Sequence, residues 1–175
     1  MIIQGWWEDD GRPYIAARVQ IPGVPSVYVD LQVDTGATHT VIAERTFSTG
    51  TLRSLGAPTV PISTSMGPVK GWLVDHSKLW LCDIDGKEHL VDDLKLHFFQ
   101  NIALNSKQWR SFKDVFGDSF PQQIQAPRNL LGRDVLNRYL MISRQDQALL
   151  LTDRSQNVLT HVKQALRITR TQDLL

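Results

Sequence analysis

Short stretches of alternating apolar and polar residues dominate the first hundred positions of the chain. Residues 14–20 are rich in strand-forming types, and residues 27–33 alternate with most apolar side chains on one face. Residues 22–26 lie between them and form a turn cluster of Pro, Gly and Ser. The pattern predicts a β-hairpin that leads directly into Asp34, with residues 41–43 continuing as a further strand.

A second hairpin is predicted over residues 60–84. Its tip, residues 65–71, contains the residues that would form a mobile flap: Met66, Gly67, Pro68 and Gly71. A tight-turn signal at Asp85-Gly86 follows, and residues 88–99 are expected to return as strands. The Gly, Ser, Thr and Pro residues between positions 46 and 58 predict a short helix or a loop.

The second half of the chain carries more helical signals. Apolar residues at helical spacing predict a helix within residues 105–120, with Gly117 as its stop. Residues 133–139 predict a second helix, and residues 140–142 and 148–152 predict closing strands. The tail could hold one more helix over residues 158–166.

Many short strands separated by turns predict a mainly β fold, a small closed β-barrel with one or two short helices. A length of 175 residues favours one domain. We therefore expect a barrel domain at residues 1–152 and a C-terminal extension at residues 153–175.

Composition narrows the choice of partners and location. The hydrophobic fraction of 42% supports a folded core, and the formal net charge of +1 favours neither nucleic acid nor an anionic membrane as a partner. No stretch is long and apolar enough to cross a membrane, and the first residues do not resemble a secretory signal. Cys82 is the only cysteine, and its apolar neighbours predict a buried structural thiol. A reducing, cytoplasmic location is the expectation.

The candidate chemistry centres on Asp34. This carboxylate follows a strand and precedes Thr35 and Gly36, and the glycine lets backbone amides approach the acidic group. The sequence contains no Gly-x-Ser-x-Gly motif, no His-Glu-x-x-His motif and no phosphate-binding Gly-x-x-x-x-Gly-Lys-Ser/Thr loop. These absences disfavour a serine hydrolase, a metallohydrolase and a nucleotide hydrolase.

Two motifs in this order resemble the retropepsin family of aspartic peptidases. The first is the loop Asp34-Thr35-Gly36-Ala37, and the second is Leu130-Leu131-Gly132-Arg133-Asp134, in the place of the family's apolar-apolar-Gly-Arg-Asn/Asp signature. The resemblance runs from about residue 14 to residue 142, with the hairpin tip at residues 65–71 in the place of the flap.

The resemblance implies a retropepsin-type barrel and a role for each motif residue. Asp34 would be the catalytic aspartate, Thr35 would join hydrogen bonds between two such loops, and Gly36 would accept contacts near the carboxylate. Leu130 and Leu131 would pack beneath the loop, and Arg133 would brace the interface region. The reaction would be hydrolysis of peptide bonds in peptides or proteins, with neither a metal ion nor another cofactor.

A homodimer follows from the same chemistry. The reaction needs two carboxyl groups that share a proton, and the chain has one Asp-Thr-Gly motif. The second Asp34 must then come from a second copy across a twofold axis. The alternative is a catalytically silent module of the same fold that serves binding or dimerisation.

Two positions depart from the resemblance. Retroviral members often carry acidic residues soon after the catalytic loop, whereas this chain has Thr38 and His39. The substrate-contacting residues and the partner of Arg133 therefore stay open, and we expect a structural role for His39. The sequence leaves open the natural substrate and processing from a larger precursor.

Overall fold

The computed structural model describes residues 1–47, 50–64, 67–99, 128–144 and 148–152. The strands in this part are β1 (Ile2–Trp7), β2 (Pro13–Gln20), β3 (Val27–Val33), β4 (Val41–Ala43), β5 (Thr59–Thr64), β6 (Gly67–Cys82), β7 (Glu88–Phe99), β8 (Leu130–Leu131), β9 (Leu140–Arg144) and β10 (Ala148–Thr152). The helical turns are η1 (Glu44–Thr46), α1 (Thr51–Ser54) and α3 (Arg133–Leu136). The predicted helix within residues 105–120 and the extension at residues 153–175 lie outside the described residues.

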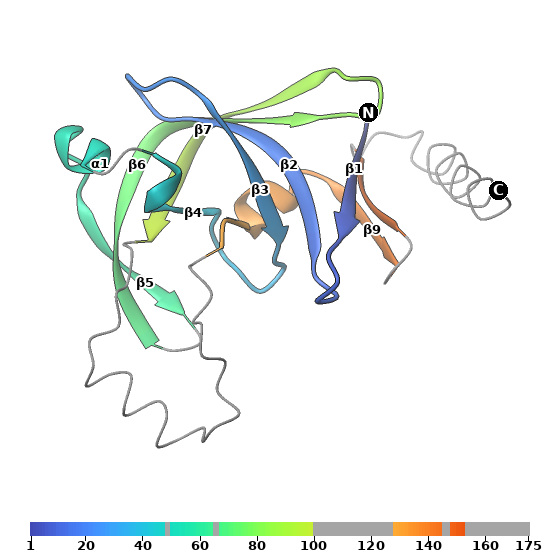
Figure 1. Cartoon of the computed structure of the whole chain (residues 1–175), viewed down its shortest axis with the longest axis horizontal. Helices are drawn as coiled ribbons and strands as arrows, with labels where there is room; N and C mark the ends of the chain where they lie inside the picture. The colour runs from blue at the N-terminus through green and yellow to red at the C-terminus, as the bar shows by residue number, and fades with distance from the viewer. Residues whose placement is uncertain (48–49, 65–66, 100–127, 145–147, 153–175) are drawn as a thin grey trace, which may run out of the picture.

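Six strands close into a barrel, in the order β2-β3-β8-β4-β7-β6 and back to β2. The closing contact is an antiparallel pairing in which Ala17 lies opposite Leu81 and Gln20 opposite Lys78. Within the described residues, β5 is attached to the barrel through β6 alone, and Figure 1 shows this hairpin projecting from the side opposite β1 and β9. The prediction of a mainly β fold with a closed barrel and short helices is confirmed.

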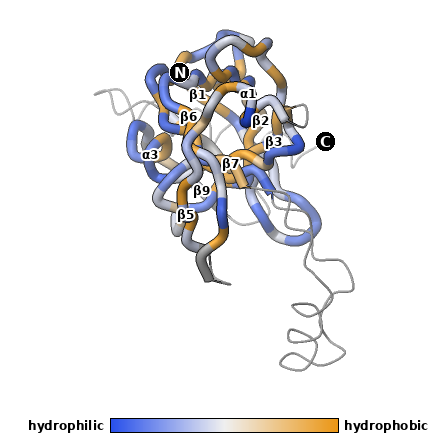
Figure 2. The backbone as a smooth tube through the Cα atoms, turned by 90° about the vertical axis from the view of Figure 1, so that its left-hand side faces the viewer, coloured by the Kyte–Doolittle hydropathy of each residue, from blue (hydrophilic) through white to orange (hydrophobic). Residues whose placement is uncertain are grey.

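Alternation along the strands produces the core. In β3, Val29, Leu31 and Val33 are buried, whereas Tyr28 and Asp30 between them are exposed. The strands accordingly carry both hydrophobic and hydrophilic positions (Figure 2). The barrel interior is filled by fully buried side chains from every part of the ring, among them Ile15, Leu31, Ile42, Leu79, Leu96, Phe98 and Leu131.

The long strand β6 pairs with β5 at one end and with β2 at the other, because bulges bend it between the two stretches. β6 pairs with β5 over Gly67–Trp72 and with β2 over Lys78–Leu81. Between these stretches the register with β7 shifts on either side of Ser77. His76 and Asp93 both have a φ of 55°, and their side chains lie 2.7 Å apart. Bulges bend a strand and increase its twist, so β6 can leave the hairpin and close the barrel.

Several sequence expectations need correction. The hairpin tip is shorter than residues 65–71, because Gly67–Gly71 already pair with Val60–Thr64 and only residues 65–66 remain as the connection, outside the described part. The helix after Gly132 covers four residues instead of seven, since β9 begins at Leu140. β1 was not predicted as a strand; it pairs with both β2 and β10.

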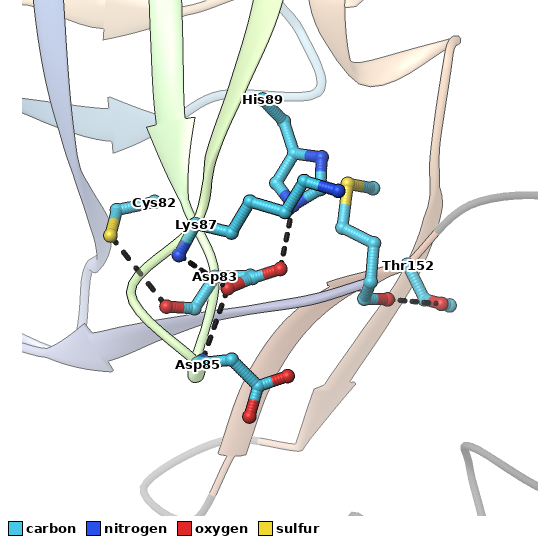
Figure 3. Close-up of polar contacts among 7 residues, drawn as sticks. Cys82, Asp83, Asp85, Lys87, His89 and Thr152 are labelled. Atoms are coloured by element: carbon cyan, nitrogen blue, oxygen red, sulfur yellow. Dashed lines mark hydrogen bonds and ion pairs between the residues drawn. The ribbon is translucent and has the colours of Figure 1, made fainter.

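Cys82 is exposed, so the prediction of a buried thiol was wrong. The cause is strand parity: Leu81 points into the core at the end of β6, and the next side chain must point outward. Asp83 instead supplies the buried group at this turn, where its carboxylate accepts hydrogen bonds from the N–H groups of Asp85 and Lys87 and lies 2.6 Å from a ring nitrogen of His89 (Figure 3).

None of the helices in the described part of the chain has the length and apolar character that a membrane crossing requires.

Candidate active site

Asp34 follows β3 and begins a tight loop. Its N–H donates to the carbonyl of Leu131 at 3.1 Å, which ties the start of the loop to β8. One carboxylate oxygen accepts the N–H of Gly36 at 2.8 Å, and the N–H of Ala37 donates to the Asp34 carbonyl at 3.2 Å. A Cβ on Gly36 would lie 3.1 Å from the same carboxylate oxygen. The loop therefore holds a half-buried carboxylate in a fixed orientation.

The turn that follows β8 is hydrogen-bonded along this loop. The N–H of Arg133 donates to the carbonyl of Ala37 at 2.9 Å, and the N–H of Asp134 donates to the carbonyl of Thr38 at 3.3 Å. The Arg133 guanidinium also donates to the Thr38 hydroxyl at 3.2 Å. Thr38 is therefore a partner of Arg133 within the chain, which answers the question raised by the departure at this position.

A buried polar cluster locks the two segments together. The Asp134 carboxylate accepts hydrogen bonds from the Thr40 N–H at 2.9 Å and from its hydroxyl at 2.8 Å, and that hydroxyl accepts the N–H of Gly132 at 3.1 Å. A Cβ on Gly132 would lie 2.3 Å from the carbonyl carbon of His39, so any side chain would force the loop away. Thr40 is fully buried, and no local sequence pattern indicates this role.

The loop forms one wall of a cavity of about 650 Å³. β5 contributes to the lining through Pro61, Ile62 and Ser63, and the complete lining is Asp34, Gly36, Ala37, Thr38, His39, Val41, Pro61, Ile62, Ser63, His97, Phe99 and Leu130. Among these described lining residues, Asp34 is the only carboxylate. The cavity therefore combines one fixed acidic group and two histidines with both apolar and small polar residues.

The predicted motif residues are brought together, with differences in detail. Asp34, Gly36, Ala37 and Leu130 line the cavity, while Leu131 is fully buried beside them. Thr35 is exposed, and its hydroxyl has no hydrogen-bond partner within the described part of the chain.

The predicted flap residues lie in the β5–β6 hairpin. Gly67, Pro68 and Gly71 belong to β6, and Met66 is outside the described residues. Gly71 is not among the described residues that line the cavity. The hairpin reaches the cavity through its other strand, β5, which the sequence did not single out.

His97 is a further site residue that the sequence did not single out. Its ring stacks on His39 with centroids 4.5 Å apart, and its pKa is lowered, chiefly by burial and then by the neighbouring His39. No local sequence pattern could have identified His97, because its place in the site depends on the parallel pairing of β4 and β7, in which Val41 lies opposite His97. In the described part of the chain, no three His, Cys, Asp or Glu side chains gather closely enough to hold a metal ion.

Comparisons with known proteins found a similar solved structure but no matching family or curated sequence. No protein-family model matches the sequence, and no curated protein sequence matches it. Among solved structures, the chain is similar to a retropepsin-like aspartic protease from Rickettsia conorii, with 18% identity and a TM-score of 0.45, over 86% of this chain and 88% of that one. Function is therefore inferred from the residues of the site itself.

Proposed function

We propose that this protein is an aspartic endopeptidase that works as a homodimer, with one Asp34 from each copy. The observation that carries the proposal is the Asp34 loop: a half-buried carboxylate, oriented by the Gly36 N–H, in the wall of a cavity large enough for several side chains. Apolar walls with a few fixed polar groups are typical of sites that bind organic ligands.

Two Asp34 carboxyl groups in one cavity would share a single proton, because like charges a few ångströms apart do not both ionise easily. The ionised carboxylate would take a proton from water, and the resulting nucleophile would attack the peptide carbonyl carbon. The protonated partner would donate its proton to the carbonyl oxygen. When the C–N bond breaks, the leaving amine takes the proton that the first carboxyl accepted from water. A hydroxyl of the tetrahedral intermediate returns a proton to the second carboxylate as the new carboxyl group forms, so the site returns to its starting state.

Two features support the dimer. Asp34 is the only carboxylate among the described residues that line the cavity, so a second one has to come from elsewhere. Thr35, beside it, is exposed and has a hydroxyl without a partner in the described part of the chain. A twofold axis near this loop would give the hydroxyl a partner and bring the second carboxylate into place. The proposal includes a cytoplasmic location, where reducing conditions suit a lone free thiol.

The test is Asp34→Asn, assayed on denatured casein and on a peptide library at acidic pH. Asparagine keeps an oxygen that can accept the Gly36 N–H, so the fold should persist. Loss of acid–base catalysis should reduce the turnover rate by about 10²- to 10⁴-fold.

The matched control is Asp30→Asn, which removes an exposed carboxylate from the outer face of the same strand. It should retain activity. Equal activity of the Asp34→Asn and wild-type chains would refute the assignment. A wild-type chain that is folded and dimeric but cleaves nothing would favour the silent binding module.

A further inference from the structure

The stacked pair His39 and His97 lies in the same cavity as Asp34, and the proposed peptide hydrolysis does not use it. Its rings are inclined by 28°, so they lie nearly face to face. Their proximity is built into the fold: the His97 N–H donates to the carbonyl of Thr40 at 3.3 Å, and Thr40 follows His39 directly. The pair is therefore a fixed feature of the cavity wall.

The two imidazole rings differ in their burial and in their hydrogen-bonding partners. His97 has a buried Nδ1 with no hydrogen-bond partner in the described structure, and a proton there would leave an unpaired N–H group in the interior. Burial and the neighbouring His39 lower the pKa of His97, against a smaller opposing effect of Asp134. The protonated form of His97 is thus disfavoured, whereas the His39 ring beside it is exposed to solvent.

The rest of the cavity wall combines an apolar cluster with the hydroxyl-bearing residues Thr38 and Ser63. Val41, Ile62 and Phe99 form a small buried cluster against which Leu130 packs, and all four line the cavity. The charged or chargeable lining groups in the described structure are Asp34 and the two histidines, since β5 contributes only Pro61, Ile62 and Ser63. A side chain bound here would have both an apolar surface and an imidazole within the same cavity.

We propose that His39, positioned by stacking on His97, forms a substrate subsite that selects an acidic side chain near the scissile peptide bond. The inference rests on the proposed peptidase activity and adds its substrate class. The aliphatic part of a glutamate would pack on the apolar cluster, and its carboxylate would pair with the His39 ring. A lysine or arginine at the same position would face the imidazolium and be disfavoured.

The experiment maps cleavage sites in a peptide library derived from a digested proteome, followed by matched peptides that differ only by Glu or Gln at the preferred position. For an ion pair at an accessible site, the wild-type kcat/KM ratio of Glu to Gln should be about three- to fivefold at pH 5. Because histidine changes its charge between pH 5 and 8, the ratio should fall towards one at pH 8.

Single substitutions distinguish the role of His39 from that of His97. His39→Gln should bring the Glu-to-Gln ratio at pH 5 close to one, whereas His97→Phe keeps an aromatic surface for stacking and should retain most of the preference. The control is His76→Asn, which removes an exposed histidine on β6, and asparagine tolerates its positive φ. This control should keep the full preference.

The outcomes distinguish the subsite from the peptidase. Peptide cleavage that depends on Asp34 but shows a ratio near one, or a ratio that His39→Gln leaves unchanged, overturns the subsite alone. Loss of the preference in His97→Phe but not in His39→Gln overturns the assignment of the charge to His39. Absence of any cleavage that depends on Asp34 overturns the proposed function instead.

Discussion

At the level of single residues, the site depends on contacts between segments almost a hundred positions apart. Gly132 packs against the carbonyl group of His39, and Asp134 accepts two hydrogen bonds from Thr40. A larger residue at position 132 would clash with backbone rather than with a flexible side chain, so the loop would have to move. Removal of one partner of a buried hydrogen bond leaves the other unsatisfied, which is why such clusters tolerate little change.

Asp83 gives a residue-level prediction about stability and pH. Its side chain is 5% exposed, and its pKa is lowered from the ordinary value of 3.8, first by the hydrogen bond to His89 and further by the N–H groups of Lys87 and Asp85. A lowered pKa in the folded state stabilises the fold fully above the ordinary pKa, and this contribution is lost as the pH falls through the lowered value. Asp83→Asn should therefore lower the Tm at pH 6 by a few degrees, and the difference should shrink below pH 4.

Thermal unfolding followed by circular dichroism between pH 2.5 and 7 measures this difference. Asp85→Asn is the control, because Asp85 is exposed in the same turn and its carboxylate has no partner among the described residues. It should leave the Tm nearly unchanged at every pH. A Tm difference for Asp83→Asn that stays constant down to pH 2.5 would show that the charge of Asp83 is not what stabilises the turn.

At the level of elements, the β5–β6 hairpin is anchored at its base, and its outer strand has no second pairing partner among the described strands. A Cβ on Gly71 would lie 2.2 Å from Ile62 and 2.4 Å from the carbonyl of Phe98, so the base is closely packed. β5 is the last strand in the order of the sheet, with a pairing partner on one side only in the described structure. Strands of this kind open locally more readily than barrel strands.

The hairpin should respond to ligand binding. Amide hydrogen exchange over residues 59–71 should be fast in the free protein. It should slow by about tenfold or more when the protein binds a peptide analogue in which a non-hydrolysable, hydroxyl-bearing group replaces the scissile bond, because closure of the hairpin excludes water. Exchange in β2 and β3 should change little and serves as the internal reference. Protection that appears only outside residues 59–71 would mean that this hairpin is not the flap.

Sequence patterns predicted well those strands and turns whose structure depends on residues close together in the sequence. The alternation in Val27–Val33 gave both the strand and its buried face, and the tight-turn signal at Asp85-Gly86 lies at the β6–β7 connection. β1 was missed because much of its pairing is with β10, nearly 150 residues away. The bulge at His76 was missed because positive φ in a histidine has no clear sequence signal.

The candidate site could be anticipated only in part. The residues around Asp34 and the Leu130–Asp134 motif were singled out because they resemble two motifs of a known family. Thr40, His97 and the β5 wall were not found, because each becomes part of the site only through pairing between distant strands. Sequence spacing indicates local geometry, whereas a cavity is defined by side chains that meet across the fold.

At the level of the whole molecule, the proposed activity belongs to a pair of chains. Mixing wild type with an equal amount of Asp34→Asn, with free exchange, gives about one half heterodimers and one quarter wild-type dimers. Since a heterodimer has one competent aspartate, activity per wild-type chain should fall to about half. Dilution below the dimer Kd should also reduce specific activity.

The control for the mixing experiment is the Asp85→Asn chain, which keeps Asp34 and should suppress nothing. Size-exclusion chromatography with light scattering reports the mass at each concentration. Full activity in a completely exchanged mixture with excess Asp34→Asn would mean that each chain works alone, and the dimeric mechanism would be wrong.

The exposed position of Cys82 makes such exchange directly observable. The chain has one cysteine, which lies at the end of β6 and is not among the described residues that line the cavity around Asp34. A maleimide dye would therefore attach at one defined position per chain without any mutation. Donor-labelled and acceptor-labelled preparations, once mixed, would report the rate of subunit exchange through energy transfer, in the same sample whose hydrolysis is being followed.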